Sequence, residues 1–161
     1  MIFIFCGCQS NSPTEPLPDE TQRLSFTPED VTISIGQQTA LTLRIENLSD
    51  SVFAISLQID YDNTILSFSS VSAAESEDFF GTEAVQFVQD TLSVLHVALS
   101  RIQGQPEVSG SGTLCSFQLE GNAAGSTSFE VTPEHLKFYD SKGREIEAQD
   151  IEIQSATVSV I

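Results

Sequence analysis

Apolar and polar residues alternate along most of the chain, and the clearest alternation runs from Phe53 to Tyr61. A period of two places successive side chains on opposite faces of a β-strand. No stretch offers a convincing long amphipathic helix. The pattern therefore predicts about nine strands separated by turns at a spacing typical of an all-β sandwich. The expected strands cover residues 31–35, 41–45, 53–61, 66–71, 85–89, 92–100, 113–119, 126–131 and 151–160.

Polar clusters that favour turns interrupt these stretches in a fixed order. The main ones are residues 61–66, 110–114 and 140–146. The acidic loop 75–78 leads into Phe79 and Phe80, which we expect to close one end of the core. In the last stretch the alternation changes phase near residues 154–155, which predicts a bulge there.

Length and charge limit the possible functions. The chain has 161 residues, 40% of them hydrophobic, which is enough for one buried core. Its formal net charge of −17 repels phosphate backbones and anionic lipid headgroups, so we do not expect a nucleic-acid partner or electrostatic membrane binding. An acidic calcium-binding surface stays open as an alternative.

The first residues resemble a bacterial lipoprotein signal with its lipobox. A short apolar stretch ends in Cys6-Gly7-Cys8, and we expect residues 1–8 to be the signal peptide, with Cys8 acylated as the lipid anchor. An ordinary hydrophobic start is the alternative. Residues 9–28 are rich in Pro, Ser, Thr and acids and are predicted to form a disordered tether. Residues 29–161 then form an extracytoplasmic domain anchored to the cell envelope.

Catalytic and metal-binding patterns are missing. His96 lies in an expected strand and His135 in a loop, neither within a motif for nucleophilic catalysis, and no pair of carboxylates stands out. The cysteines and histidines lack zinc spacing. Asp140–Gly143 is better explained as a β-turn with Gly143 at positive φ than as a calcium loop. Asp60, Asp62 and Asn63 are likewise better explained as turn residues at the end of a strand than as ligands of a cation. We therefore predict no enzyme activity, no cofactor and no metal.

The aromatic residues do not favour a flat sugar-binding surface. The chain has no Trp, Tyr61 falls on the inward side of its strand, and Tyr139 stands alone. Sugar rings usually stack on exposed Trp or Tyr, so carbohydrate binding is possible but disfavoured.

Taken together, four segments resemble a cohesin domain over about residues 29–160. They are Val31–Gly36, Leu57–Leu66, Gly110–Phe117 and the turn Asp140–Ile146. The resemblance implies a jelly-roll sandwich that binds a dockerin-like protein partner in assemblies linked to polysaccharide breakdown. A carbohydrate-binding module of the same fold and a purely structural surface domain remain as alternatives.

The resemblance also implies that the partner lies across one sheet, formed by the third, fifth, sixth and eighth expected strands. Well-studied cohesins often carry Asn and Asp early on the third strand, where this chain has Ala54 and Ser56. An ordinary solvated sheet face is the alternative reading of this surface. The expected partner-binding residues are Ala54, Ser56, Gln58, Asp60, Gln86, Val88, Val94, His96 and Ala98, with Ser128 and Glu130 at the margin.

Overall fold

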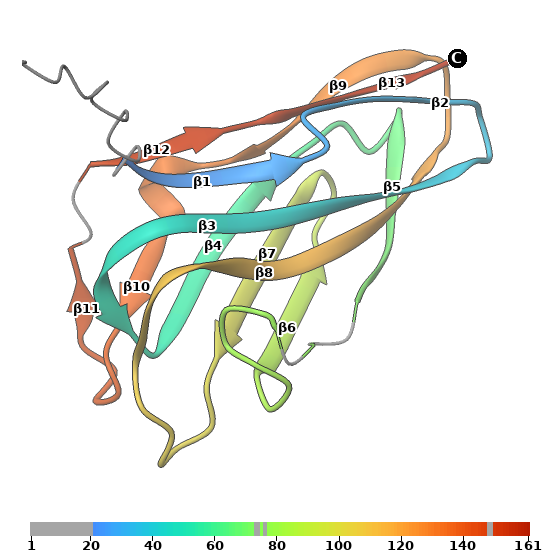
Figure 1. Cartoon of the computed structure of the whole chain (residues 1–161). Helices are drawn as coiled ribbons and strands as arrows, with labels where there is room; N and C mark the ends of the chain where they lie inside the picture. Colours follow the sequence, from blue (N-terminus) through green and yellow to red (C-terminus); the bar gives the residue numbers. More distant parts are fainter. Residues whose placement is uncertain (1–20, 73–74, 76, 148–149) are drawn as a thin grey trace, which may run out of the picture.

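The computed structural model describes residues 21–72, 75, 77–147 and 150–161, which form two β-sheets packed face to face (Figure 1). The first sheet has the order β12 (Ile151–Gln154), β1 (Gln22–Thr27), β3 (Gln38–Val52), β8 (Val108–Gly121) and β5 (Leu66–Val71). The second has the order β11 (Glu145–Ile146), β10 (Lys137–Tyr139), β4 (Ala54–Asp60), β9 (Gly125–Val131), β13 (Ala156–Val160) and β2 (Asp30–Ile33). On the free edge of β4 lie β7 (Val94–Ser100) and then β6 (Val85–Asp90). The prediction of an all-β sandwich is confirmed.

The described residues contain thirteen strands where the sequence predicted about nine. One reason is that the last predicted strand is divided between the sheets: β12 pairs with β1 in the first sheet, and β13 pairs with β9 and β2 in the second. Ser155, between them, is therefore the point where the chain changes sheets. The predicted bulge near residues 154–155 is wrong, because the change of phase marks a sheet crossing. The short strands β10 and β11 were not predicted at all.

The N-terminal part of the domain shows the same division. β1 pairs antiparallel with β3 in the first sheet, and β2 pairs parallel with β13 in the second. The predicted tether over residues 9–28 is therefore wrong for Gln22–Thr27, where Leu24 and Phe26 are buried. Burial of these two apolar side chains stabilises the strand in the sheet, although the neighbouring residues in the sequence are polar and rich in proline. The remainder of the tether up to residue 20, and the predicted signal peptide 1–8, lie outside the described residues.

The core fills the space between the sheets and is rich in phenylalanine. The rings of Phe26, Phe117 and Tyr61 surround Phe129, with centroid distances of 5.2, 5.6 and 5.8 Å. Phe79 and Phe80 are both buried, with their rings 5.0 Å apart in an edge-to-face arrangement, as expected for residues that close one end of the core. This packing holds both sheets rigidly, so the residues on their outer faces have defined positions.

Candidate functional site

The pairing of β4 with β7 builds the centre of the expected partner-binding face. Ser56 lies opposite Ala98, Gln58 opposite His96, and Asp60 opposite Val94. Residues directly opposite each other point to the same side of a sheet. Their neighbours Leu57, Leu95 and Val97 are buried, so the predicted outward set on these two strands does lie on the outer face of the second sheet.

The predicted facing of β6 is wrong. Gln86 lies opposite Leu99 and Val88 opposite Val97, and both of those partners are buried, so Gln86 and Val88 point inward. The outward residues of β6 are instead Val85, Phe87 and Gln89, opposite Ser100, Ala98 and His96. The sequence Val-Gln-Phe-Val-Gln contains apolar residues in both phases, so its alternation did not indicate which side faces the core.

The corrected facing of β6 places Phe87 on the outer face of the sheet. Its side chain is 57% exposed, and that of Val85 is 56% exposed. Phe87 lies opposite Ala98 and Val85 opposite Ser100, in the C-terminal half of β7. A large aromatic side chain exposed on a regular strand is the type of residue that dominates protein interfaces.

Two further strands extend the face on the other side of β4. On β10, Lys137 lies opposite Ser56 and Tyr139 opposite Ala54. On β9, Glu130 lies opposite Asp60, and Ser128 faces the same side, which places both at the margin as predicted. Sequence reasoning missed Lys137 and Tyr139 because a strand of three residues is too short to show a period.

A shallow depression of about 270 Å³ lies in the centre of this face. It is bordered by strands β4, β6, β7 and by the short 3-10 helix η1 (Pro133–His135) with β10. Both histidines of the chain contribute to it. Its lining residues are Ser56, Leu57, Gln58, Phe87, His96, Val97, Ala98, His135 and Lys137.

The hairpin between β6 and β7 carries an exposed apolar residue at its tip. Leu92 is 86% exposed, and it has a φ of 50°, followed by Ser93 with a φ of 80°. Two consecutive residues with positive φ form the type of turn that usually contains Asn-Gly, because other residues adopt it only with strain. Strain of this kind often accompanies functional sites. Sequence reasoning placed residue 92 in a strand and did not find it.

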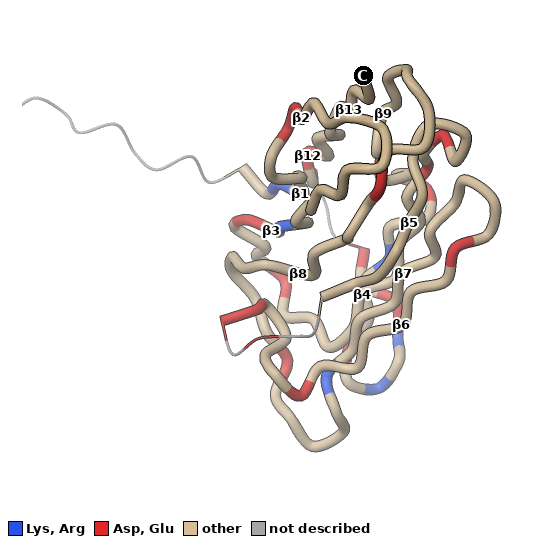
Figure 2. The backbone as a smooth tube through the Cα atoms, turned by 90° about the vertical axis from the view of Figure 1, so that its right-hand side faces the viewer, with Lys and Arg blue, Asp and Glu red and all other residues tan. Residues whose placement is uncertain are grey.

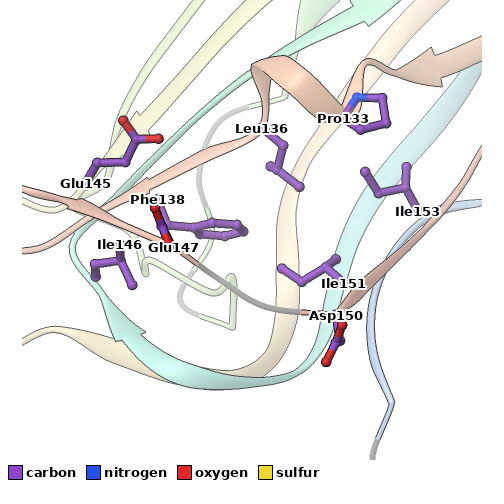
Figure 3. Close-up of a pocket in the computed structure, with 9 residues that line it drawn as sticks. All are labelled: Pro133, Leu136, Phe138, Glu145, Ile146, Glu147, Asp150, Ile151 and Ile153. Atoms are coloured by element: carbon purple, nitrogen blue, oxygen red, sulfur yellow. The ribbon is translucent and has the colours of Figure 1, made fainter.

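A second pocket lies at one end of the sandwich, between β10 and β11 on one side and β12 on the other (Figure 3). Its volume is about 410 Å³. Leu136, Phe138, Ile151 and Ile153 supply apolar side chains, and Figure 3 shows Glu147 and Asp150 beside them. Among the described residues that line this pocket, the only groups able to act as a base or a nucleophile are carboxylates.

Of the carboxylates that sequence reasoning assigned to turns, Asp140 and Asp62 do serve as turn residues, whereas Asp60 is the last residue of strand β4. Asp140 accepts backbone hydrogen bonds from Lys142 and Arg144 at 2.9 and 2.8 Å, and these bonds, the one from Arg144 above all, lower its pKa. Gly143 has a φ of 76°, as expected for this turn. The Asp62 carboxylate similarly accepts hydrogen bonds from the hydroxyl and from the backbone NH of Thr64. These bonds lower the pKa of Asp62. Within the described residues, no group of three or more His, Cys, Asp or Glu is placed to hold a metal ion.

The buried titratable groups are structural. Burial, followed by the hydrogen bond to Asp90 at 2.8 Å, raises the pKa of Tyr61, which therefore stays protonated. Burial likewise raises the pKa of the Cys115 thiol, so this cysteine is not a reactive nucleophile. In the described part of the chain, no helix is long and apolar enough to cross a membrane.

The family model of the cohesin domain matches residues 24–154. The chain belongs to the cohesin family. Cohesin domains are non-catalytic modules for protein interaction. The resemblance of residues 29–160 to a cohesin domain is confirmed. A search of curated proteins found none that matches this cohesin.

Solved structures with the same fold include several cohesins. The third cohesin ScaC of Acetivibrio cellulolyticus, solved in complex with the ScaB dockerin, is 12% identical with a TM-score of 0.67, and the match covers 87% of this chain and 99% of that one. A cohesin from a type I cohesin–dockerin complex of Clostridium thermocellum is 14% identical (TM-score 0.65; 88% and 94% covered). A non-cellulosomal cohesin of the archaeon Archaeoglobus fulgidus is 16% identical (TM-score 0.66; 88% and 91% covered). At these identities the likeness shows the fold alone.

Proposed function

We propose that this cohesin binds a dockerin-like protein partner through the outer face of β4, β6, β7 and β10. The observation that carries the proposal is the exposure of Phe87 and Val85 on a regular sheet face beside Ala98. Large apolar side chains exposed together on a soluble domain favour an interaction site over a solvated surface. Leu92, at the tip of the adjoining hairpin, adds a third exposed apolar residue.

The shape of the face supports a protein partner more than a sugar. Tyr61 is buried in the core, and Tyr139 is half-buried on β10, so neither offers an open ring platform. The exposed Phe87 lies at the border of a depression whose lining, among the described residues, contains several hydrogen-bond donors and no carboxylate. We expect no retardation of the protein in gels that contain soluble polysaccharide, and clear retardation would favour the carbohydrate-binding alternative.

Membrane anchoring and localisation are a separate part of the proposal. We propose that Cys8 is acylated and holds the domain outside the cytoplasm on the cell envelope, because Cys6-Gly7-Cys8 resembles a lipobox. The variant Cys8→Ser should release the protein from the membrane fraction. Membrane retention unchanged by that substitution would contradict the anchor but not the protein-binding function.

The binding proposal can be tested by capture of secreted proteins from the same cells on the immobilised domain, with and without a chelator. A matched pair of variants locates the surface. Ala98→Asp places a charge at the centre of the proposed face, and Ala40→Asp places the same charge on an exposed position of β3, in the other sheet. A charge in a desolvated interface can cost about 2 kcal/mol or more, whereas exposed substitutions change stability by about 0.5 kcal/mol.

We expect Ala98→Asp to lose the captured partner and Ala40→Asp to retain it, with both proteins folded. Equal capture by the two variants would show that the partner uses another surface. Loss of capture in the presence of the chelator would indicate that the domain or its partner needs calcium to form the complex.

A further inference from the structure

The depression at the centre of the outer face differs in charge from the rest of the molecule. The chain has 23 Asp and Glu residues and only six Lys and Arg residues. Figure 2 shows many of the acidic residues in loops and at strand ends. The depression is lined by Lys137, His96 and His135, and no carboxylate lines it. It therefore provides a local surface of cationic and neutral donors on an acidic protein.

The hydrogen bonds around His96 leave one of its ring nitrogens available. The Thr91 hydroxyl donates to the carbonyl of Val94 at 3.3 Å, so its oxygen accepts from Nε2–H of His96 at 2.8 Å. Nδ1 of His96 and the ring of His135 have no hydrogen-bond partner among the described residues. These ring nitrogens are therefore groups of the depression that a partner side chain can engage.

The charged groups around the depression are few and most are already bound. Nζ of Lys137 donates to Glu145 at 2.6 Å, and Asp60 accepts a hydrogen bond from Thr132. Glu134 precedes His135 in η1 and is exposed. The remaining neighbours on β4 and β6, Gln58 and Gln89, are uncharged.

We infer that the partner places a carboxylate side chain, Asp or Glu, in this depression and packs an apolar side chain against Phe87 and Ala98. This inference rests on the proposed function and assigns the chemistry of the partner. A carboxylate would accept hydrogen bonds from a ring N–H of His135 and from Lys137, whose ammonium has further N–H groups besides the one that binds Glu145. Such charge-assisted bonds are about twice as strong as neutral ones. A Lys or Arg side chain at the same place would find no carboxylate among the lining residues and would meet the Lys137 ammonium.

The test uses short peptides, so it does not depend on the identity of the natural partner. The labelled protein is titrated at pH 6 with Ac-Leu-Glu-Leu-NH2, and with the same peptide carrying Gln or Lys in the middle, while NMR follows the rings of His96, His135 and Phe87. We expect the Glu peptide to shift all three with a dissociation constant of about 1–10 mM, and the other two peptides to bind at least about five-fold more weakly.

Two variants complete the test. The double variant His96→Gln and His135→Gln should remove the preference for Glu, whereas Arg44→Gln, which removes a cation from the outer face of the other sheet, should leave it unchanged. Equal or tighter binding of the Gln or Lys peptide, or no shift by the Glu peptide at about 20 mM, would overturn the inference. The proposed function would survive that result if a partner is still captured through Ala98, and it would fail separately if no partner is captured.

Discussion

The two outer faces of the sandwich differ in how they use their polar side chains. On the first sheet, neighbouring strands are joined by cross-strand contacts: Thr42 and Ser116 hydroxyls lie 2.7 Å apart, and Arg44 donates to Thr113 at 3.1 Å. Arg23 on β1 pairs with Glu46 on β3 and with Glu152 on β12. The polar side chains of this face mostly bind one another, so few of them are available to a partner.

The outer face of the second sheet has the opposite character. On β6, Phe87 and Val85 are exposed, and His96 and His135 border a depression that no carboxylate lines. The face has apolar surface to bury and donors to satisfy, which are the two requirements of a protein interface. The difference supports the proposal that the first sheet mainly stabilises the fold and the second binds the partner.

The largest expected effect comes from a charge on the inner side of the binding sheet. Val97 is 2% exposed and lies next to Ala98 in β7. Val97→Asp should unfold the domain, because burying an unpaired carboxylate costs more than about 4 kcal/mol. Circular dichroism would measure the loss of the cooperative thermal transition. A folded Val97→Asp protein would show that the assigned facing of β7 is inverted.

A smaller effect is expected from removal of the exposed aromatic ring. Phe87→Ala should weaken partner binding by about 2 kcal/mol, or roughly 30-fold, while changing the free energy of unfolding by only about 0.5 kcal/mol. Calorimetric titration and a melting curve would measure the two quantities. Val88→Ala, on the inward side of the same strand, is the matched control: it should cost stability and leave binding nearly intact.

In the strained hairpin between β6 and β7, one substitution should raise the stability of the domain and weaken partner binding. Replacing Leu92 by Asn suits a residue with positive φ and keeps the Ser93 Oγ that accepts a hydrogen bond from the Asn63 NH. It should stabilise the domain by about 0.5 kcal/mol. The same change removes the exposed Leu92 side chain, so partner binding should weaken. Denaturant unfolding and affinity measured on the same sample test both parts. A variant that is stabilised and binds normally would show that Leu92 lies outside the interface.

The smallest effect is expected on the first sheet. Arg23→Gln removes two partly exposed ion pairs that join three strands. Exposed ion pairs contribute little, so the domain should lose about 0.5 kcal/mol of stability, and less at high salt. Partner binding should not change. A clear loss of affinity would weaken the division of tasks between the two faces.

The local sequence pattern alone determined the facing of several strands and the conformation of one turn. The period of two over residues 53–61 and 92–100 correctly assigned Ile55, Leu57, Val97 and Leu99 to the core. The residues of the Asp140 turn predicted the positive φ of Gly143. These features depend on neighbouring residues, because facing and turn type are set within a few positions of the chain.

Other features were decided only by the tertiary structure. The side of β6 that faces outward follows from its register with β7, because Val85, Phe87 and Val88 make both phases of the strand apolar. The strand Gln22–Thr27 exists because β3 and β12 pair with it, and Ser155 changes sheets because β1 and β9 lie in different layers. The depression joins residues from β4, β6, β7 and β10. Such juxtapositions depend on pairing between residues far apart in the chain, and a periodic pattern carries no information about which strands become neighbours.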